Sequence, residues 1–261
     1  MPSVTHGGAT LRYDRAGSGT PVLLVHGWTC NRTFWHRQVQ ALRDRHTVIT
    51  VDLRGHGESS RPRAGFTIGA MATDLEALVR TLRVPRIAVV GWSMGGVIAQ
   101  ELARRLGDHV SALALVGTTP GGLADPANPD ADPAASAEIQ QAVARDFRAF
   151  ARTLAVTLFR EGVEPAHVAW AQSQIQKTPP HVAEACLAAV LAFDARPWLA
   201  ELQVKTAVLH GRHDHLLPLR GGEYLAKHIP GATLTVFEQS GHSPHLEEPD
   251  ALNAALAQLL G

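Results

Sequence analysis

The stretch "RIAVVGWSMGGVIAQELARRL", residues 86–106, decides the fold. It opens with a short run of Ile, Ala and Val, which is typical of a strand buried on both faces. It closes with good helix formers, and between the two parts Ser93 lies in a Gly-x-Ser-x-Gly pattern. Gly and Ser also mark ordinary turns, but this pattern between a strand and a helix is typical of a nucleophile elbow. We therefore predict that Ser93 is a nucleophile at a sharp strand-to-helix turn.

Further short apolar runs alternate with helical patterns along the chain. Ile68, Met71, Leu75, Leu78 and Leu82 recur at three- and four-residue steps, which places them on one helix face. Residues 97–106 and 251–260 are rich in helix formers. This alternation predicts an α/β fold, a mostly parallel sheet with helices on both faces. We expect strands at 21–27, 47–52, 86–91, 112–117, 206–211 and 233–237, and an edge strand at 10–17.

The alternation breaks between about residues 120 and 204. Pro, Gly, Asp and Ala dominate residues 119–136, which indicates a loop, and residues 137–159 and 181–193 have helical patterns. We therefore expect a core formed by residues 1–120 and 204–261, with a helical insertion at 121–203. Its expected role is to cover one end of the sheet, where ligands of open α/β folds bind.

Composition limits the classes of partner. The chain has 261 residues, 45% of them apolar, and Lys plus Arg equals Asp plus Glu at 24 each, so charge gives no reason to expect nucleic acid or a membrane surface. Two cysteines imply no disulfide framework, no signal peptide is visible, and no apolar run approaches the ~20 residues that span a bilayer. We expect a cytoplasmic protein.

A serine hydroxyl needs a base, and the expected chain order is nucleophile, acid, histidine. His242 follows the last predicted strand, and Gly241 before it permits a tight turn that aims the ring inward. The competing residue is His245, which we expect to be structural or pocket-lining. We predict that His242 is the base.

The acid should follow the strand at 206–211, where Asp214 is the only acidic residue. The alternatives are a surface turn aspartate at this position, or Asp194 in the insertion as a weaker candidate. His213 and His215 flank Asp214, but adjacent residues in an extended loop point in different directions, and no HExxH or CxxC pattern supports a metal. We expect neither a metal nor a cofactor.

Acyl transfer also needs donors for the developing oxyanion. We predict the backbone N–H groups of Met94, directly after the nucleophile, and Trp28, after an early strand. In "DLRGHGES" (52–59), Asp52 and Arg54 are interpreted as scaffold. Cys30 is interpreted as a small buried side chain rather than a nucleophile, and Trp92 either packs beneath the elbow or lines the pocket. The candidate substrate-binding residues are Trp28, Cys30, Trp92, Phe147, Phe150 and His245.

Together these motifs resemble the α/β-hydrolase superfamily over nearly the whole chain. The residues that carry the resemblance are "HGW" (26–28), "DLRGHGES", "GWSMGG" (91–96), "GRHD" (211–214) and "GHSPHLEEP" (241–249). The resemblance implies eight strands, a helical cap between the sixth and seventh, the triad Ser93, Asp214 and His242, and the two oxyanion donors above. The chain is similar to pimeloyl-carrier-protein methyl esterases, carboxylesterases, enol-lactonases and cofactor-free haloperoxidases. Ser93 argues against haloalkane dehalogenases, which have an aspartate there.

Arginines recur in the insertion at Arg145, Arg148, Arg152 and Arg160. Such a face could receive an acidic carrier protein, although Asp146 and Glu161 interrupt it. A solvated helix face is the commoner explanation.

Three hypotheses for function follow. The first is a serine esterase that cleaves small or medium carboxylic esters or lactones through an acyl-enzyme. The second keeps the triad for C–C bond hydrolysis, perhydrolysis or a lyase step. The third, of another class, is a non-catalytic ligand-binding protein on the same fold, since fold alone does not imply activity.

Overall fold

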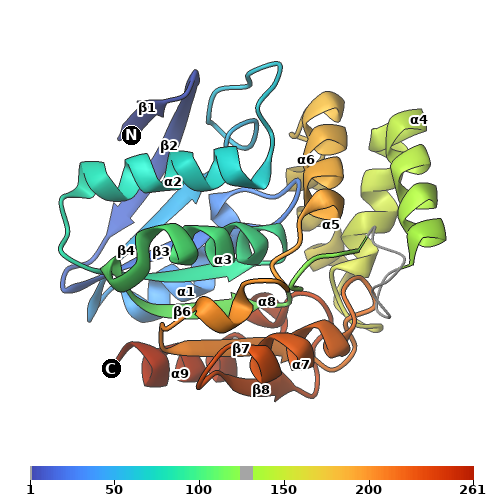
Figure 1. Cartoon of the computed structure of the whole chain (residues 1–261). Helices are drawn as coiled ribbons and strands as arrows, with labels where there is room; N and C mark the ends of the chain where they lie inside the picture. The colour runs from blue at the N-terminus through green and yellow to red at the C-terminus, as the bar shows by residue number, and fades with distance from the viewer. Residues whose placement is uncertain (1, 124–131) are drawn as a thin grey trace.

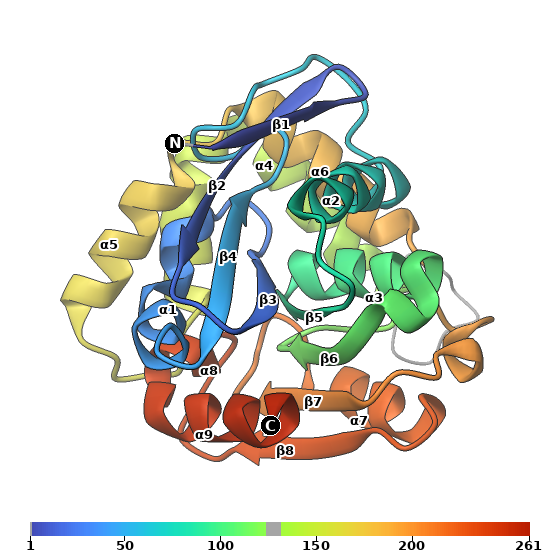
Figure 2. The ribbon, with the colours of Figure 1, turned by 90° about the vertical axis from the view of Figure 1, so that its left-hand side faces the viewer.

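The computed structural model describes residues 2–123 and 132–261 and contains one eight-stranded sheet with the order β1-β2-β4-β3-β5-β6-β7-β8 (Figures 1 and 2). From β4 to β8 all neighbouring strands are parallel, whereas β1–β2 and β2–β4 are antiparallel. This confirms the predicted fold class. The strands are β1 (Ser3–His6), β2 (Ala9–Ala16), β3 (Thr20–Val25), β4 (His46–Asp52), β5 (Ile87–Trp92), β6 (Val110–Val116), β7 (Thr206–Gly211) and β8 (Thr233–Phe237).

Helices cover both faces of the sheet because its central strands are apolar throughout. Alternate residues along each strand point to opposite faces, so Leu23 and Val25 pack in one hydrophobic cluster and Val22 and Leu24 in another. Figure 2 shows α2, α3 and α7 on the first face and α1 and α9 on the second. Their bounds, with α8, are α1 (His36–Leu42), α2 (Ile68–Leu82), α3 (Met94–Leu106), α7 (Leu219–His228), α8 (Pro244–Glu247) and α9 (Pro249–Leu260). Short 3₁₀ turns occupy Arg32–Trp35, Gly107–His109 and Leu199–Glu201.

The edge of the sheet differs from the sequence prediction. Residues 10–17 were expected to form an edge strand, but β2 pairs with β1 on one side and β4 on the other. The edge is β1, whose four residues are mostly exposed. A strand this short and this polar has no apolar run to reveal it.

Among the described residues, three α-helices lie between β6 and β7 in the chain: α4 (Pro133–Thr157), α5 (Pro165–Ile175) and α6 (Pro180–Ala192). Figure 1 shows them together beyond the carboxyl ends of the central strands. None of the described helices combines the length and apolar character that crossing a bilayer requires.

The helices of the insertion differ in detail from those predicted. Helix α4 begins before residue 137, because the Asp132 side chain accepts a hydrogen bond from the Ala135 N–H and Pro133 fits the first helical position. It is kinked at Asp146, whose backbone is non-helical (φ −159°, ψ 88°). Helix α5 was not predicted, since only Ala171 and Ile175 are buried on it. The predicted loop at 119–136 lies partly outside the described residues.

The two ends of the insertion are joined by hydrogen bonds. Gly121 and Asp194 form an antiparallel bridge. The Gly122 N–H donates to the Phe193 carbonyl at 2.7 Å, and the Ala195 N–H donates to the Pro120 carbonyl at 2.8 Å. The chain therefore enters and leaves the insertion at one place, where residues 120–122 pair with residues 193–195. We call this pairing the closed neck.

Candidate active site

Ser93 lies at the junction between β5 and α3 in a strained conformation, with φ 55° and ψ −122°. A non-glycine residue rarely adopts positive φ, and such outliers cluster at functional sites. The turn is possible because Gly91 and Gly95 lack side chains: a Cβ on Gly91 would lie 2.3 Å from the Gly95 carbonyl oxygen, and one on Gly95 would lie 2.2 Å from the Val25 carbonyl oxygen. The Thr118 hydroxyl donates to the Ser93 carbonyl at 2.8 Å. The predicted elbow is present in the backbone.

His242 and Asp214 form a buried pair. His242 Nδ1 lies 2.7 Å from Asp214 Oδ2, and both side chains are inaccessible to solvent. The other carboxylate oxygen accepts the N–H groups of Leu216 and Leu217 at 3.0 and 2.8 Å. Since Nδ1 carries the proton in this pair, Nε2 has a free lone pair, and it has no hydrogen-bond partner among the described residues.

The elbow and this pair converge on the end of β6. The Ser93 N–H donates to the Val116 carbonyl at 2.9 Å. A Cβ on the next residue, Gly117, would lie 3.5 Å from His242 Nδ1 and 3.6 Å from Asp214 Oδ2. The structure thus places the three predicted residues after β5, β7 and β8, around the carboxyl end of β6. The alternative acid, Asp194, lies in the neck and pairs with Arg196 at 2.7 Å.

The environment keeps Asp214 ionised. Burial alone would raise its pKa, but His242 and His210 together lower the pKa well below the ordinary value of an aspartate. His210 was not singled out from the sequence. Its Nε2 lies 3.3 Å from Asp214 Oδ2 and 2.8 Å from the Leu217 carbonyl oxygen. A histidine in the strand just before "GRHD" is the signal that could have identified it.

His245 does not take part in this pair. It is fully buried between Trp35 and Trp92, with ring centroids 4.9 and 4.4 Å away. Burial lowers its pKa well below the ordinary value, so the ring is neutral. Its position favours the structural interpretation over a pocket-lining one.

Trp92 packs beneath the elbow. Its side chain is fully buried, it stacks on Phe34 at 5.5 Å, and its indole N–H donates to the His242 carbonyl at 2.8 Å. The residue that precedes Ser93 therefore holds the backbone of His242. This burial disfavours substrate contact by Trp92.

The other pocket candidates divide by exposure. Cys30 and Phe147 are 1% and 3% exposed and belong to the hydrophobic core. Burial raises the pKa of the Cys30 thiol well above its ordinary value, which disfavours a thiolate. Trp28 and Phe150 are half-buried neighbours, with ring centroids 6.1 Å apart. Of the aromatic candidates, these two are best placed to meet a ligand.

The loop after β3 orients the first predicted oxyanion donor. His26 Nε2 accepts the Leu53 N–H at 3.0 Å, so the proton lies on Nδ1, which donates to the Gly27 carbonyl at 2.8 Å. Burial lowers the pKa of His26 to about 4 and keeps this neutral form. The Gly27 carbonyl and the Trp28 N–H belong to one planar peptide, so the hydrogen bond sets the direction of that N–H.

Both predicted donor groups are available. The Trp28 N–H donates to no other described residue. Met94 is the first residue of α3, where a backbone N–H has no partner within the helix. The helix dipole adds positive potential at the same place.

The segment 52–59, which was interpreted as scaffold, binds neighbouring segments through side-chain hydrogen bonds. Asp52 is fully buried and binds the Arg32 side chain and the Arg32 and Glu58 N–H groups. Arg54 forms a two-point ion pair with Asp74, at 2.5 and 2.6 Å.

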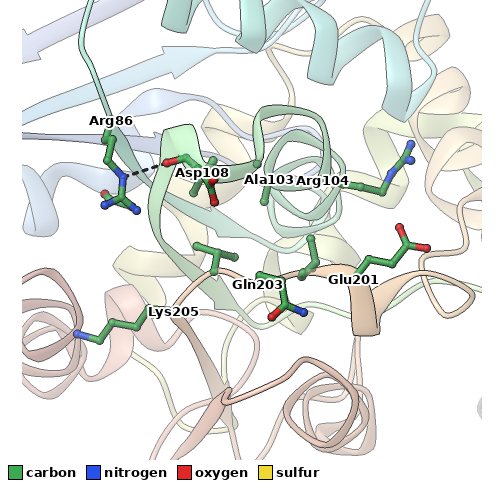
Figure 3. A pocket seen from close by; sticks show the side chains of 12 residues that line it. Arg86, Ala103, Arg104, Asp108, Glu201, Gln203 and Lys205 are labelled. Atoms are coloured by element: carbon green, nitrogen blue, oxygen red, sulfur yellow. Dashed lines mark hydrogen bonds between the residues drawn. The ribbon is translucent and has the colours of Figure 1, made fainter.

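A separate pocket of about 440 Å³ lies at the far end of α3, beside Arg104 and the start of β6. Figure 3 shows that Arg86, Arg104 and Lys205 lie apart from one another, and that Arg86 donates to the Asp108 carbonyl. Since Ser93 lies at the opposite end of α3, this pocket is not part of the candidate site. Among the described residues no group of three or more His, Cys, Asp or Glu side chains could hold a metal ion.

Comparison with known proteins agrees with this architecture. Residues 20–249 match the family described as alpha/beta hydrolase fold, and the chain belongs to that family. It is 35% identical to the pimeloyl-acyl-carrier-protein methyl ester esterase of Chromobacterium violaceum, over 96% of this chain and 98% of the relative.

Two solved structures are similar throughout. The bromoperoxidase of Bacillus anthracis has a TM-score of 0.93 and 26% identity, covering 97% of this chain and 95% of the other. The enol-lactonase of Burkholderia xenovorans LB400 has a TM-score of 0.91 and 25% identity, covering 99% of each chain.

Proposed function

We propose that this chain is a serine hydrolase that cleaves small or medium carboxylic esters or lactones, with Ser93, His242 and Asp214 as its triad. The observation that carries the proposal is the buried 2.7 Å contact between His242 Nδ1 and Asp214 Oδ2, which leaves Nε2 without a partner among the described residues. The pair lies at the end of β6, to which the strained Ser93 is also hydrogen bonded. A carboxylate in this position holds the imidazole in the tautomer that accepts a proton at Nε2.

The proposed reaction has two halves. His242 Nε2 takes the hydroxyl proton of Ser93 as Oγ attacks the ester carbonyl, and the oxyanion forms between the N–H groups of Trp28 and Met94. The imidazolium then gives its proton to the leaving alcohol, and an acyl-enzyme remains. His242 next takes a proton from water, whose oxygen attacks the acyl group, and the acid leaves as Ser93 regains its proton.

Asp214 stabilises the imidazolium that exists in each half. Because its pKa is held well below the ordinary value, the carboxylate is charged throughout the neutral pH range. The same residues need no metal or cofactor for this chemistry.

The proposed substrate class follows from the relatives and the insertion. Two of the similar proteins carry the names methyl ester esterase and enol-lactonase, and both names denote cleavage of a carboxylic ester bond. In the proposed division of the chain, residues 121–203 form a cap over the site, and the half-buried Trp28 and Phe150 face an apolar part of the substrate.

We keep a small molecule as the proposed substrate rather than a carrier-bound one. Arg145, Arg148 and Arg152 are exposed on α4, as a dock for an acidic carrier would need, but exposed Asp146 and Glu161 interrupt them. Cys30 and Cys186 are buried and unpaired, which fits the proposed cytoplasmic location.

The test is Ser93→Ala, compared with the unchanged chain on p-nitrophenyl esters of increasing acyl length and on simple lactones. We expect turnover and fluorophosphonate labelling to be lost together while the fold is kept. Survival of both would contradict the proposal. Because a bromoperoxidase is among the similar structures, peracid formation from acetate and hydrogen peroxide is measured on the same samples. Peracid formation without ester turnover would favour perhydrolysis instead.

A further inference from the structure

The loop that carries the Trp28 N–H is tied to the insertion by three hydrogen bonds. The Trp28 indole N–H donates to the Ala183 carbonyl at 2.9 Å. The Thr178 hydroxyl donates to the Thr29 carbonyl at 3.0 Å. Asn31 Nδ2 donates to Gln174 Oε1 at 3.2 Å. The loop therefore contacts both the end of α5 and the start of α6.

The Thr178 contact meets the loop at its most strained residue. Thr29 has φ 58° and is fully buried. A β-branched residue at positive φ is a true outlier, and it persists only where neighbouring contacts hold it. Thr29 donates its own hydroxyl to the Trp28 carbonyl at 2.7 Å, and its carbonyl is held by Thr178, which is only 3% exposed.

A chain of peptide groups connects Thr178 to the oxyanion donor. The Thr29 carbonyl and the Cys30 N–H belong to one planar peptide, so the Thr178 hydroxyl fixes the direction of that N–H. The Cys30 N–H closes the turn by donating to the Gly27 carbonyl at 3.2 Å. The Gly27 carbonyl shares its own peptide with the Trp28 N–H.

We infer that Thr178, in the segment between α5 and α6, is a positioning residue for the oxyanion donor, so that the insertion helps to set the geometry of catalysis. This inference rests on the proposed function. His26 anchors the Gly27 carbonyl from the core side, and Thr178 anchors the same turn from the side of the insertion. Thr178 touches no reacting atom in this arrangement.

The experiment compares Thr178→Val with Thr178→Ser and with a matched control, Thr206→Val. Valine keeps the shape of threonine and removes the donor, while serine keeps the donor. Thr206 is 2% exposed and donates to the Val204 carbonyl at 2.8 Å, but it lies at the start of β7, away from the site. Thr206→Val therefore measures how much activity is lost when an equivalent hydrogen bond is removed away from the site.

Removal of a whole oxyanion donor costs about 10²–10³ in turnover, so misdirecting one should cost less. We expect Thr178→Val to lower kcat and kcat/KM equally, by about 5- to 50-fold, because the lost interaction acts in the transition state only. Affinity for a trifluoromethyl ketone, which forms a tetrahedral adduct, should fall by a similar factor. Thr178→Ser should restore kcat to within about threefold of the unchanged chain, as should Thr206→Val.

A kcat for Thr178→Val equal to that of Thr206→Val would overturn the inference, as would a rise in KM alone. If the valine variant does not fold, Thr178→Ala is measured against the same control, with the same two outcomes. The Ser93→Ala result separates the two proposals: an inactive Ser93→Ala together with an unaffected Thr178→Val rejects only the role of Thr178. An active Ser93→Ala rejects the proposed function itself.

Discussion

Two buried tryptophans allow the contribution of one hydrogen bond, from the Trp92 indole to the His242 carbonyl, to be measured. Trp92 and Trp35 are both fully buried and both contact the His245 ring. Their indole groups differ in hydrogen bonding: the Trp92 N–H donates to the His242 carbonyl at 2.8 Å, whereas the Trp35 N–H has no partner among the described residues. Replacing each with phenylalanine removes a similar volume, so the comparison isolates the hydrogen bond.

Trp92→Phe leaves a buried carbonyl without its donor, which costs about 1–3 kcal/mol. Trp35→Phe removes a buried donor that had no partner, so its loss of stability comes only from the smaller ring. We therefore expect Trp92→Phe to be less stable than Trp35→Phe by about 1–3 kcal/mol in guanidinium unfolding, with Tm lower by about 2–4 °C for each kcal/mol.

Trp92→Phe should also be less active than Trp35→Phe. Without the indole donor, the backbone of His242 loses an anchor beside the proposed base, so kcat on a p-nitrophenyl ester should fall further for Trp92→Phe than for Trp35→Phe. The reasoning is refuted if the two variants have equal stability, or if Trp35→Phe is the less stable.

Two further predictions concern charge. Asp214→Asn should lower kcat by about 10⁴ with little change in KM, because an amide cannot stabilise the imidazolium, whereas Asp194→Asn should stay within a few fold of the unchanged chain; a loss below tenfold for Asp214→Asn would argue against the acid assignment. Burial lowers the pKa of His26 to about 4 and that of His56 to about 3, against 6.5 in the unfolded chain. Between those values the unfolded state binds protons that the folded state does not, so stability is full above about pH 6.5 and falls toward pH 4. We expect a loss of about 2 kcal/mol for each of these histidines between pH 7 and pH 5 in urea unfolding, and a smaller loss in His56→Gln; an identical pH dependence in that variant would count against the burial argument.

Much of the fold could be predicted because its strands are apolar on both faces. Helix α2 was predicted because apolar residues from Ile68 to Leu82 recur on one face, and the structure has a helix over these residues. The exposed β1 and the weakly buried α5 have no such pattern, and the backbone break at Asp146 in α4 leaves no trace in helix-forming composition.

A site residue could be predicted where its order in the chain and its place after a strand are enough to identify it. Ser93, Asp214 and His242 each follow an apolar run, so their convergence follows from the topology of a parallel sheet. Contacts between distant segments could not be foreseen. The sequence does not say that the Trp92 ring lies under His242, that His210 reaches Asp214, or that a single threonine before two prolines binds the loop after β3.

The closed neck at Gly121 and Asp194 has a consequence for how such a chain can diversify. Both ends of the insertion are fixed by hydrogen bonds before its helices begin, and β6 and β7 are already neighbours in the sheet. Parts of the insertion that do not touch the core can therefore be lengthened, shortened or exchanged while β6 and β7 stay paired. Contacts between the insertion and the core limit this freedom. Thr178 donates to the Thr29 carbonyl, and the Arg160 N–H donates at 2.7 Å to Glu247, which also accepts the N–H groups of Gly241 and Ser243 on either side of His242. Under the proposed function, we expect substitutions at these contacts to alter rate and selectivity together, and substitutions elsewhere in the insertion to alter selectivity alone.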